Sequence, residues 1–197
     1  MLVVIDIGNT NITMGLFDGD EIIGNYRLTT KLERTSDEYG FMLLSFLNAS
    51  NIDVEQIQNV IIASVVPKIM YSFTNSIKKY FNKEPIIIGP GIKTGIRIKI
   101  DNPKELGADR LVDAAGAYYI YGGPCLVIDF GTATTFDIIN DHGDFLGGAT
   151  APGIGISVNA LSSQAAKLPE IEIKKPKNII AKNTVSSMQA GIVYGYI

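Results

Sequence analysis

Cysteine and histidine are nearly absent from this chain of 197 residues, which contains one of each, Cys125 and His142. A single cysteine cannot form an internal disulfide, so the sequence is consistent with a reducing compartment and predicts a cytoplasmic location. Zinc sites use several cysteine or histidine ligands, and one of each therefore argues against a zinc protein.

Long apolar runs and a surplus of basic residues are missing as well. No stretch approaches the roughly 20 apolar residues that span a bilayer, and the N-terminus lacks the basic start and cleavage pattern of a signal peptide. The net charge is −3 and no dense stripe of lysine and arginine is present, which argues against non-specific binding of nucleic acid. We therefore expect neither a membrane nor a nucleic acid among the partners.

Several familiar catalytic signatures are also lacking. The chain has no GxxxxGK[ST] phosphate loop and no Gly-x-Ser-x-Gly elbow of a serine hydrolase. Asp129–Gly131 reads Asp-Phe-Gly, the magnesium-binding tripeptide of protein kinases, but the HRD loop and the strand lysine of that fold are missing. The segment Gly89–Gly95 lacks dinucleotide-binding spacing, and we interpret it as a flexible connector.

What the chain does contain is one pattern that occurs twice, 123 residues apart. Leu2–Thr13 reads as a buried strand ending in Asp6, a tight polar turn at Gly8 and a second strand, and the same order surrounds Asp129 and Gly131. Glycine allows a positive φ and lets a ligand approach the main chain, and the N–H groups of such a turn suit phosphate oxygens. One such turn could be a plain polar hairpin. Two of them favour phosphate binding, with a cation beside each carboxylate.

The surrounding pattern predicts an α/β fold. Residues 1–30 read as three strands, and Thr35 or Ser36 can cap the helix that follows. Next come three elements in order: a buried strand at Asn59–Val66, a helix from Pro67 to about Phe81 and a short strand at Pro85–Ile88. This order predicts an antiparallel hairpin on one side of an otherwise parallel sheet.

The second half of the chain repeats the first. We expect a helix over Ala108–Tyr121, the second hairpin, a third strand at Phe145–Ala149 and helices at Ile154–Ala166 and Asn183–Tyr196. A duplicated half should continue with further strands and a helix. We therefore expect these 197 residues to be an incomplete chain.

A third feature is the segment Gly107-Ala108-Asp109-Arg110 at the start of the predicted helix. A carboxylate and a guanidinium beside the free N–H groups of a helix start could orient a hydroxyl and hold an anionic group. A capping aspartate with a neighbouring surface arginine explains the same residues equally well, so the local sequence leaves both interpretations open.

Five ordered segments of the chain resemble type III pantothenate kinases, a family of the acetate-and-sugar-kinase/actin-like superfamily. They are DIGNTNIT (Asp6–Thr13), NPKELGADR (Asn102–Arg110), DFGTATTFD (Asp129–Asp137), GGATAPGI (Gly147–Ile154) and NTVSSMQAG (Asn183–Gly191). The resemblance implies duplicated ribonuclease-H-like domains with mixed sheets at residues 1–112 and 113–197, the second incomplete, with ATP in the cleft between them.

The resemblance implies ATP-dependent phosphorylation of pantothenate to 4'-phosphopantothenate, the first step of coenzyme A synthesis. ATP would contact Thr132 in the second turn. In the segment around Gly8 it would contact Asp6, Ile7, Gly8, Asn9, Thr10, Asn11, Ile12 and Thr13. Asp6 would also help to hold Mg²⁺, and Asp129 would bind a monovalent cation, K⁺ or NH₄⁺.

Pantothenate itself would be held by a small set of residues: Gly107, Ala108, Asp109, Arg110 and Thr184. Asp109 would be the proton acceptor. Family members are generally homodimers in which the second subunit contributes to the pantothenate pocket, so a homodimer is expected. Ile100 stands where the family usually carries an aromatic residue that lines this pocket, which predicts a pocket that is either reshaped or closed by another side chain.

Two alternatives to a pantothenate kinase remain on the sequence. One is a catalytically silent regulator of the same fold, and the other is a superfamily kinase for another small hydroxyl or acid substrate. The chain carries Asp6, Asp109, Arg110 and Asp129 together, and a pure regulator has no chemical need for this complete set.

Overall fold

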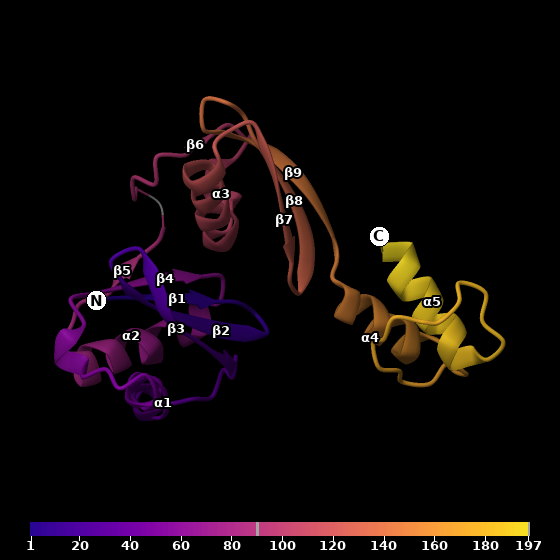
Figure 1. The fold of residues 1–197 in the computed structure, drawn as a ribbon, viewed down its shortest axis with the longest axis horizontal. Helices are drawn as coiled ribbons and strands as arrows, with labels where there is room; N and C mark the ends of the chain where they lie inside the picture. The colour runs from indigo at the N-terminus through magenta and orange to yellow at the C-terminus, as the bar shows by residue number, and fades with distance from the viewer. Residues whose placement is uncertain (90, 197) are drawn as a thin grey trace. The chain divides into compact units, whose positions relative to one another are not determined.

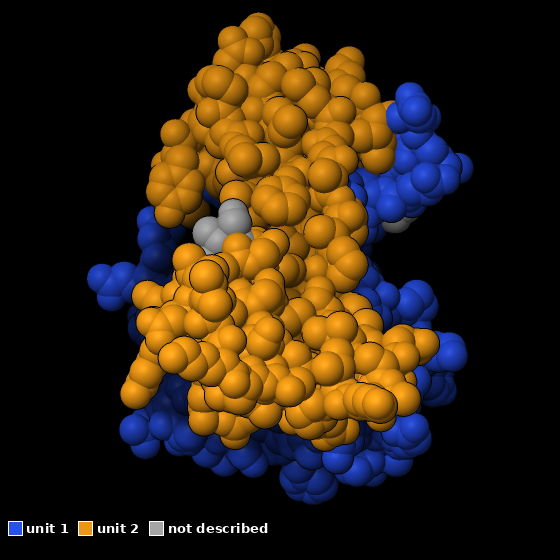
Figure 2. Space-filling view, turned by 90° about the vertical axis from the view of Figure 1, so that its right-hand side faces the viewer, with its two compact units in different colours: residues 1–96, 101–116 blue, residues 97–100, 117–197 orange. Residues whose placement is uncertain are grey.

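Two mixed β-sheets organise the chain in the computed structural model, which describes residues 1–89 and 91–196 (Figure 1). The first sheet belongs to a unit of residues 1–96 and 101–116, and the second to a unit of residues 97–100 and 117–197, blue and orange in Figure 2. The domain boundary after residue 112 stays a prediction. Within the predicted connector, Pro90 lies outside the described residues.

The first sheet has the strand order β3-β2-β1-β4-β5. Its strands are β1 (Leu2–Ile7), β2 (Asn11–Asp18), β3 (Glu21–Thr29), β4 (Asn59–Ser64) and β5 (Ile86–Ile87). The pairs β1–β2 and β2–β3 are antiparallel, whereas β1–β4 and β4–β5 are parallel. The predicted antiparallel hairpin beside a parallel sheet is therefore confirmed.

Two helices, α1 (Ser36–Ala49) and α2 (Pro67–Phe81), supply the rest of the core of this unit. Thr35 rather than Ser36 caps α1, because its hydroxyl accepts from the Glu38 N–H while the Glu38 carboxylate accepts from the Thr35 N–H. Alternate residues of β1 and β2 are buried in one cluster with α1 and α2. The remaining residues, including Asp6, thus lie on the opposite face of the sheet.

The second sheet has the strand order β6-β9-β8-β7. Its strands are β6 (Arg97–Ile98), β7 (Cys125–Phe130), β8 (Ala133–Ile139) and β9 (Asp144–Pro152). The three long strands form an antiparallel meander, as in the first unit, and β6 pairs with β9 in parallel. The two-residue strand β6 was not predicted, because it is too short for any periodicity to show.

Three further helices follow: α3 (Ala108–Tyr121), α4 (Ile154–Gln164) and α5 (Thr184–Tyr196). The bounds of α3 are those predicted from the sequence, and its first nine residues belong to the first unit. Short 3₁₀ turns occur at Val54–Gln56 and Pro103–Glu105. Within the described part of the chain, no helix combines the length and apolarity that crossing a bilayer requires.

Candidate active site

The first turn, residues 8–10, joins β1 to β2 and is held by the end of β3. The Gly8 N–H donates to the Asn11 carbonyl at 2.9 Å, which closes the turn. Thr30 fixes it from outside, because its hydroxyl donates to the Gly8 carbonyl at 2.7 Å and its N–H donates to the Thr10 carbonyl at 2.9 Å. Sequence reasoning missed Thr30, since a threonine after a strand carries no signal of a partner in another turn.

Glycine at positions 8 and 131 supplies space rather than an unusual torsion. A positive φ was one predicted reason for these glycines, and it is wrong: the positive-φ glycines of the described chain lie elsewhere, for example at Gly19 and Gly143. A Cβ on Gly8 would lie 3.2 Å from the Asn11 carbonyl oxygen. Each turn therefore keeps its main chain uncovered, as the approach of a phosphate requires.

Asp6 lies at a cavity of about 490 Å³ on the face of the first sheet opposite the buried core cluster. Its neighbour across the hairpin is Thr13, and Val112 and Asp113 of α3 also line the cavity. The described residues contain no group of three or more acidic, histidine or cysteine side chains placed for a metal. Mg²⁺ usually takes one or two carboxylates together with water and phosphate, so the exposed Asp6 carboxylate fits that ion.

The segment Gly107–Arg110 lies at the same end of the first sheet as the first turn. A Cβ on Gly107 would be 3.5 Å from the Val65 side chain, and the Val65 N–H donates to the Ile7 carbonyl at 3.0 Å. The start of α3 therefore lies against the carboxyl ends of β1 and β4, where ligands of open α/β sheets bind.

The Asp109 carboxylate has a defined position within this segment. Its Oδ1 accepts a hydrogen bond from the Arg110 N–H at 2.7 Å, and a Cβ on Gly107 would lie only 2.4 Å from the same oxygen. Asp109 and Arg110 are both half-buried. Position 107 thus needs a glycine, because any side chain there would displace the carboxylate.

The second turn, Gly131–Thr132, joins β7 to β8 and contacts the start of α4. The Gly131 N–H donates to the Ala133 carbonyl and the Gly153 N–H to the Thr132 carbonyl, both at 3.0 Å. A Cβ on Gly153 would be 2.4 Å from the carbonyl oxygens of both Gly131 and Thr132. Sequence reasoning read Pro152-Gly153 only as a helix start and missed this contact.

The helix α4 leaves its first N–H groups without a capping side chain. Its N-cap is Gly153, which cannot supply a side-chain acceptor. The N-terminus of a helix carries unsatisfied N–H groups and a partial positive charge, both suited to an anion. Beside the second turn, these groups add to the phosphate-binding capacity that the turn itself offers.

Asp129 lies on β7, directly opposite Thr135 of β8. Its Oδ2 would be 3.2 Å from a Cβ on Gly131, so the carboxylate extends over the second turn. The Thr135 hydroxyl is buried and has no hydrogen-bond partner in the described part of the chain. A carboxylate and an unsatisfied hydroxyl are the oxygen ligands that K⁺ accepts and the acceptors that NH₄⁺ needs, so these residues fit a monovalent cation.

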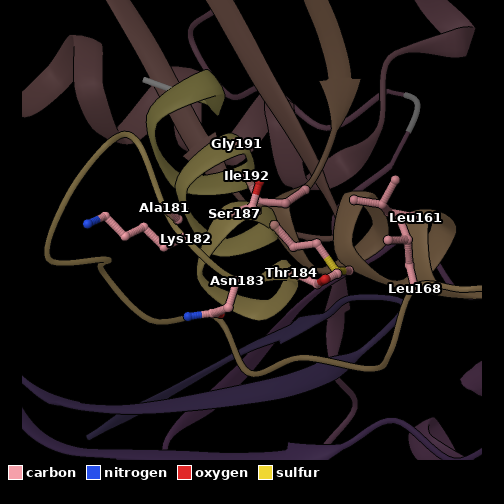
Figure 3. Close-up of a pocket in the computed structure, with 10 residues that line it drawn as sticks. Leu161, Leu168, Ala181, Lys182, Asn183, Thr184, Ser187, Gly191 and Ile192 are labelled. Atoms are coloured by element: carbon pink, nitrogen blue, oxygen red, sulfur yellow. The ribbon is translucent and has the colours of Figure 1, made fainter.

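Thr184 is the first residue of α5 and lines a pocket of about 590 Å³ between α4 and α5 (Figure 3). Asn183 caps the helix, since its side-chain oxygen accepts from the Ser186 N–H at 2.9 Å. The pocket wall is mostly apolar, with Leu161, Leu168, Met188 and Ile192. Lys182 adds one positive charge to the rim.

Ile100 lies in the second unit beside β9. Its Cγ2 would be 3.8 Å from a Cβ on Gly147, which has a φ of +126°. The aliphatic side chain is half-buried and covers this glycine.

A family profile described as type III pantothenate kinase matches residues 2–197. The chain belongs to this family. A curated type III pantothenate kinase from Agathobacter rectalis is 59% identical over 197 residues, which are 100% of this chain and 76% of that protein. The predicted pantothenate kinase activity with ATP as phosphate donor is thereby confirmed, and with it the prediction that this chain is an enzyme.

A solved structure supports the fold. It is the crystal structure of a Campylobacter jejuni protein described as a Baf family transcriptional activator. The alignment covers 98% of this chain and 75% of that protein chain, with a TM-score of 0.56 and 21% sequence identity. At this identity the likeness shows the fold alone. The predicted α/β fold with duplicated ribonuclease-H-like domains is confirmed by the two mixed sheets together with the family assignment.

Proposed function

We propose that Asp109 is the proton acceptor when this pantothenate kinase transfers the γ-phosphate of ATP to the terminal hydroxyl of pantothenate. One observation supports this assignment. Gly107 is so close to Val65 that an added Cβ would lie 3.5 Å from the Val65 side chain, and Val65 follows the end of the first sheet where the first turn begins. A hydroxyl bound beside Asp109 therefore lies at the edge of the sheet that carries a phosphate-binding turn.

The two turns bind phosphate oxygens through main-chain N–H groups and short polar side chains. Asn9 and Thr10 serve the first turn, and Thr132, with the start of α4, serves the second. Fixed dipoles of this kind stabilise charge without reorganisation during the reaction. Neither turn contains a lysine, so the positive charge that a lysine supplies in other phosphate loops has to come from bound cations.

Asp109 needs no unusual base strength for this reaction. Phosphoryl transfer passes through a loose transition state, in which positioning and charge neutralisation matter more than removal of the proton. The carboxylate orients the pantothenate hydroxyl and accepts its proton late. Arg110 and Thr184 bind the remaining polar groups of pantothenate, and the Arg110 guanidinium suits a carboxylate.

Two cations complete the charge balance. Asp6 contributes to Mg²⁺ binding and Asp129 to binding of K⁺ or NH₄⁺, and both ions neutralise phosphate charge when bound. Turnover should consequently require K⁺ or NH₄⁺. Full activity in Na⁺ alone would exclude this role for Asp129.

The decisive test is an ATP-coupled assay with pantothenate on the wild-type chain and on Asp109→Asn. We expect the substitution to lower kcat by about 100-fold or more while ATP binding is retained, because the phosphate-binding turns are unchanged. The control Asp20→Asn, in the exposed turn between β2 and β3, should keep wild-type kcat.

Other results would select the alternatives. A kcat for Asp109→Asn close to that of the wild type would exclude the proposed base. Turnover with another hydroxyl compound but not with pantothenate would indicate a different acceptor.

We also expect a homodimer with a pantothenate pocket that both subunits share, and a cytoplasmic location. The second unit exposes an apolar sheet face that supports self-association. It consists of Leu126, Ile128, Phe130, Phe136 and Ile138. Exposed apolar surface of this extent on one face is typical of interaction surfaces.

A further inference from the structure

Thr135 carries one of two buried side-chain oxygens without a hydrogen-bond partner in the described part of the chain. The other, Asp144 Oδ1, forms an ion pair with Arg97 at 2.6 Å. Thr135 is the third of the seven residues of β8, is 9% exposed, and its Oγ1 has no hydrogen-bond partner. A buried hydroxyl without a partner costs about 1–3 kcal/mol, so a native structure rarely contains one without a ligand or a water molecule beside it.

The strand register places this hydroxyl beside the Asp129 carboxylate. Thr135 is the direct partner of Asp129 on β7 and of Thr150 on β9. Opposite residues of antiparallel strands project from the same face, with Cβ atoms about 4.5–5.5 Å apart. Three oxygen-bearing side chains therefore form one row across the sheet, with the buried Thr135 in the centre.

The same pair of residue types occurs in the first unit. Asp6 of β1 is the direct partner of Thr13 on β2, just as Asp129 is the partner of Thr135. The two hairpins differ in length, since Ile7 pairs with Ile12 around four residues whereas Phe130 pairs with Thr134 around three. Both hairpins therefore place an aspartate opposite a threonine. Of the two threonine hydroxyls, only that of Thr135 is both buried and without a hydrogen-bond partner in the described part of the chain.

We propose that the Thr135 hydroxyl is a second protein ligand of the monovalent cation that Asp129 binds. This inference rests on the proposed function of Asp129 and adds a residue to the same site. A hydroxyl is a neutral oxygen donor, so Thr135 adds a ligand without adding charge to the Asp129 carboxylate. A second carboxylate, the buried Asp137, lies two residues further along the same face of β8. Binding the cation also gives the buried Thr135 oxygen the partner that it lacks.

The test measures cation binding through the thermal stability of the full chain. Choline chloride is replaced by KCl at constant ionic strength, and the rise in Tm is followed as a function of the K⁺ concentration. We expect the wild type to gain stability, Asp129→Asn to gain none, and Thr135→Val to need K⁺ concentrations about tenfold higher or more. Thr135→Ser, which keeps the hydroxyl, should respond like the wild type.

Thr134→Val is the matched control, because it removes a hydroxyl from the opposite face of the same strand. Its Tm in choline chloride can fall, since the Thr134 hydroxyl is hydrogen-bonded to Tyr196, but its response to K⁺ should be unchanged. Should Thr135→Val fail to fold, Thr135→Ala and Thr135→Ser provide the same comparison. Thallium(I) NMR, with Tl⁺ in place of K⁺, reports the bound ion directly.

The outcomes separate this inference from the proposed function. Equal K⁺ responses of Thr135→Val and the wild type, with loss in Asp129→Asn, would exclude Thr135 as a ligand, leave Asp129 in place, and indicate that a water molecule satisfies the hydroxyl. A wild type whose Tm does not respond to K⁺ and that binds no Tl⁺ would exclude both the cation site at Asp129 and Thr135 as its ligand. Loss in both variants with retention in Thr134→Val and Thr135→Ser would support the inference.

Discussion

At the scale of single residues, glycines control where the polar groups of the site lie. A Cβ added to Gly107 or to Gly153 would lie 2.4 Å from a neighbouring oxygen, which is too close for any side chain. In one case the oxygen belongs to the Asp109 side chain, and in the other to main-chain carbonyls. The two glycines therefore lead to different expectations, because a side chain can move away and a backbone turn cannot do so cheaply.

Gly107→Ala should impair catalysis more than folding. The new Cβ would lie 2.4 Å from the Asp109 Oδ1, so the carboxylate has to rotate away. We expect kcat to fall by about tenfold to 100-fold, with Tm close to that of the wild type, measured by the coupled assay and by calorimetry. Gly116→Ala is the control within the same helix, where a Cβ meets nothing within 4 Å. It should keep kcat and gain about 0.5–1 kcal/mol, and a similar loss of kcat in both variants would contradict the explanation.

Gly153→Ala should instead disturb the second turn itself. Its Cβ would overlap the carbonyl oxygens of Gly131 and Thr132, so the turn has to shift. We expect a loss of about 1–3 kcal/mol in the free energy of unfolding and a raised KM for ATP. Gly155→Ala, two residues further along α4, has open space around its Cβ and is the control. Indistinguishable stabilities of these two variants would show that the turn does not rest on Gly153.

At the scale of elements, α1 and α2 are joined by a polar contact as well as by their apolar faces. Asp37, in the first turn of α1, accepts hydrogen bonds at 2.8 Å from the Lys79 ammonium and the Tyr80 hydroxyl, near the end of α2. Gly40 makes this possible, because a Cβ at that position would be 2.0 Å from the Tyr80 ring. The hydrogen bond from Lys79, followed by that from Tyr80, lowers the pKa of Asp37 below its usual 3.8.

This contact predicts a pH-dependent contribution to stability. A carboxyl group whose pKa is lowered on folding stabilises the protein above its unfolded pKa, and the contribution is lost as the pH falls through the folded value. We expect Asp37→Asn to lower Tm at pH 7 by a small amount, because the pair is exposed. The difference from the wild type should vanish as the pH is taken below 3.8. Asp20→Asn, which removes an exposed carboxyl from the β2–β3 turn, is the control variant. A Tm difference between Asp37→Asn and the wild type that persists at acid pH would exclude the ionic contact as its source.

At the scale of the whole molecule, the apolar face of the second sheet predicts association. Replacing Ile128 by glutamate should dissociate the expected homodimer, since a charge on this face opposes its burial. Sedimentation velocity on the wild type and Ile128→Glu measures the change. Ile180→Glu, at a loop position that is 86% exposed, is the control. A monomeric wild type, or a dimer that Ile128→Glu leaves intact, would show that this face is not the interface.

The sequence by itself determined the longer helices and strands and the family of this protein. Local signals gave these elements near their observed bounds. They are the alternation of apolar residues in the strands, the capping residues of α1, Pro67 at the start of α2 and the end of α3 after Tyr121. The paired Asp–x–Gly turns and the Gly107–Arg110 segment are ordered motifs, which led to the kinase family. Such features depend on neighbours in the chain, so they can be read without coordinates.

Only the tertiary structure decided what supports those motifs. Three supports join residues distant in sequence: Thr30 to the first turn, Val65 to Gly107, and Gly153 to the second turn. The register of a single hairpin sets a fourth, the unsatisfied Thr135 opposite Asp129. Their residue types are common and carry no periodic signal. Strand register and chain packing fix these partners, and a sequence pattern does not contain either.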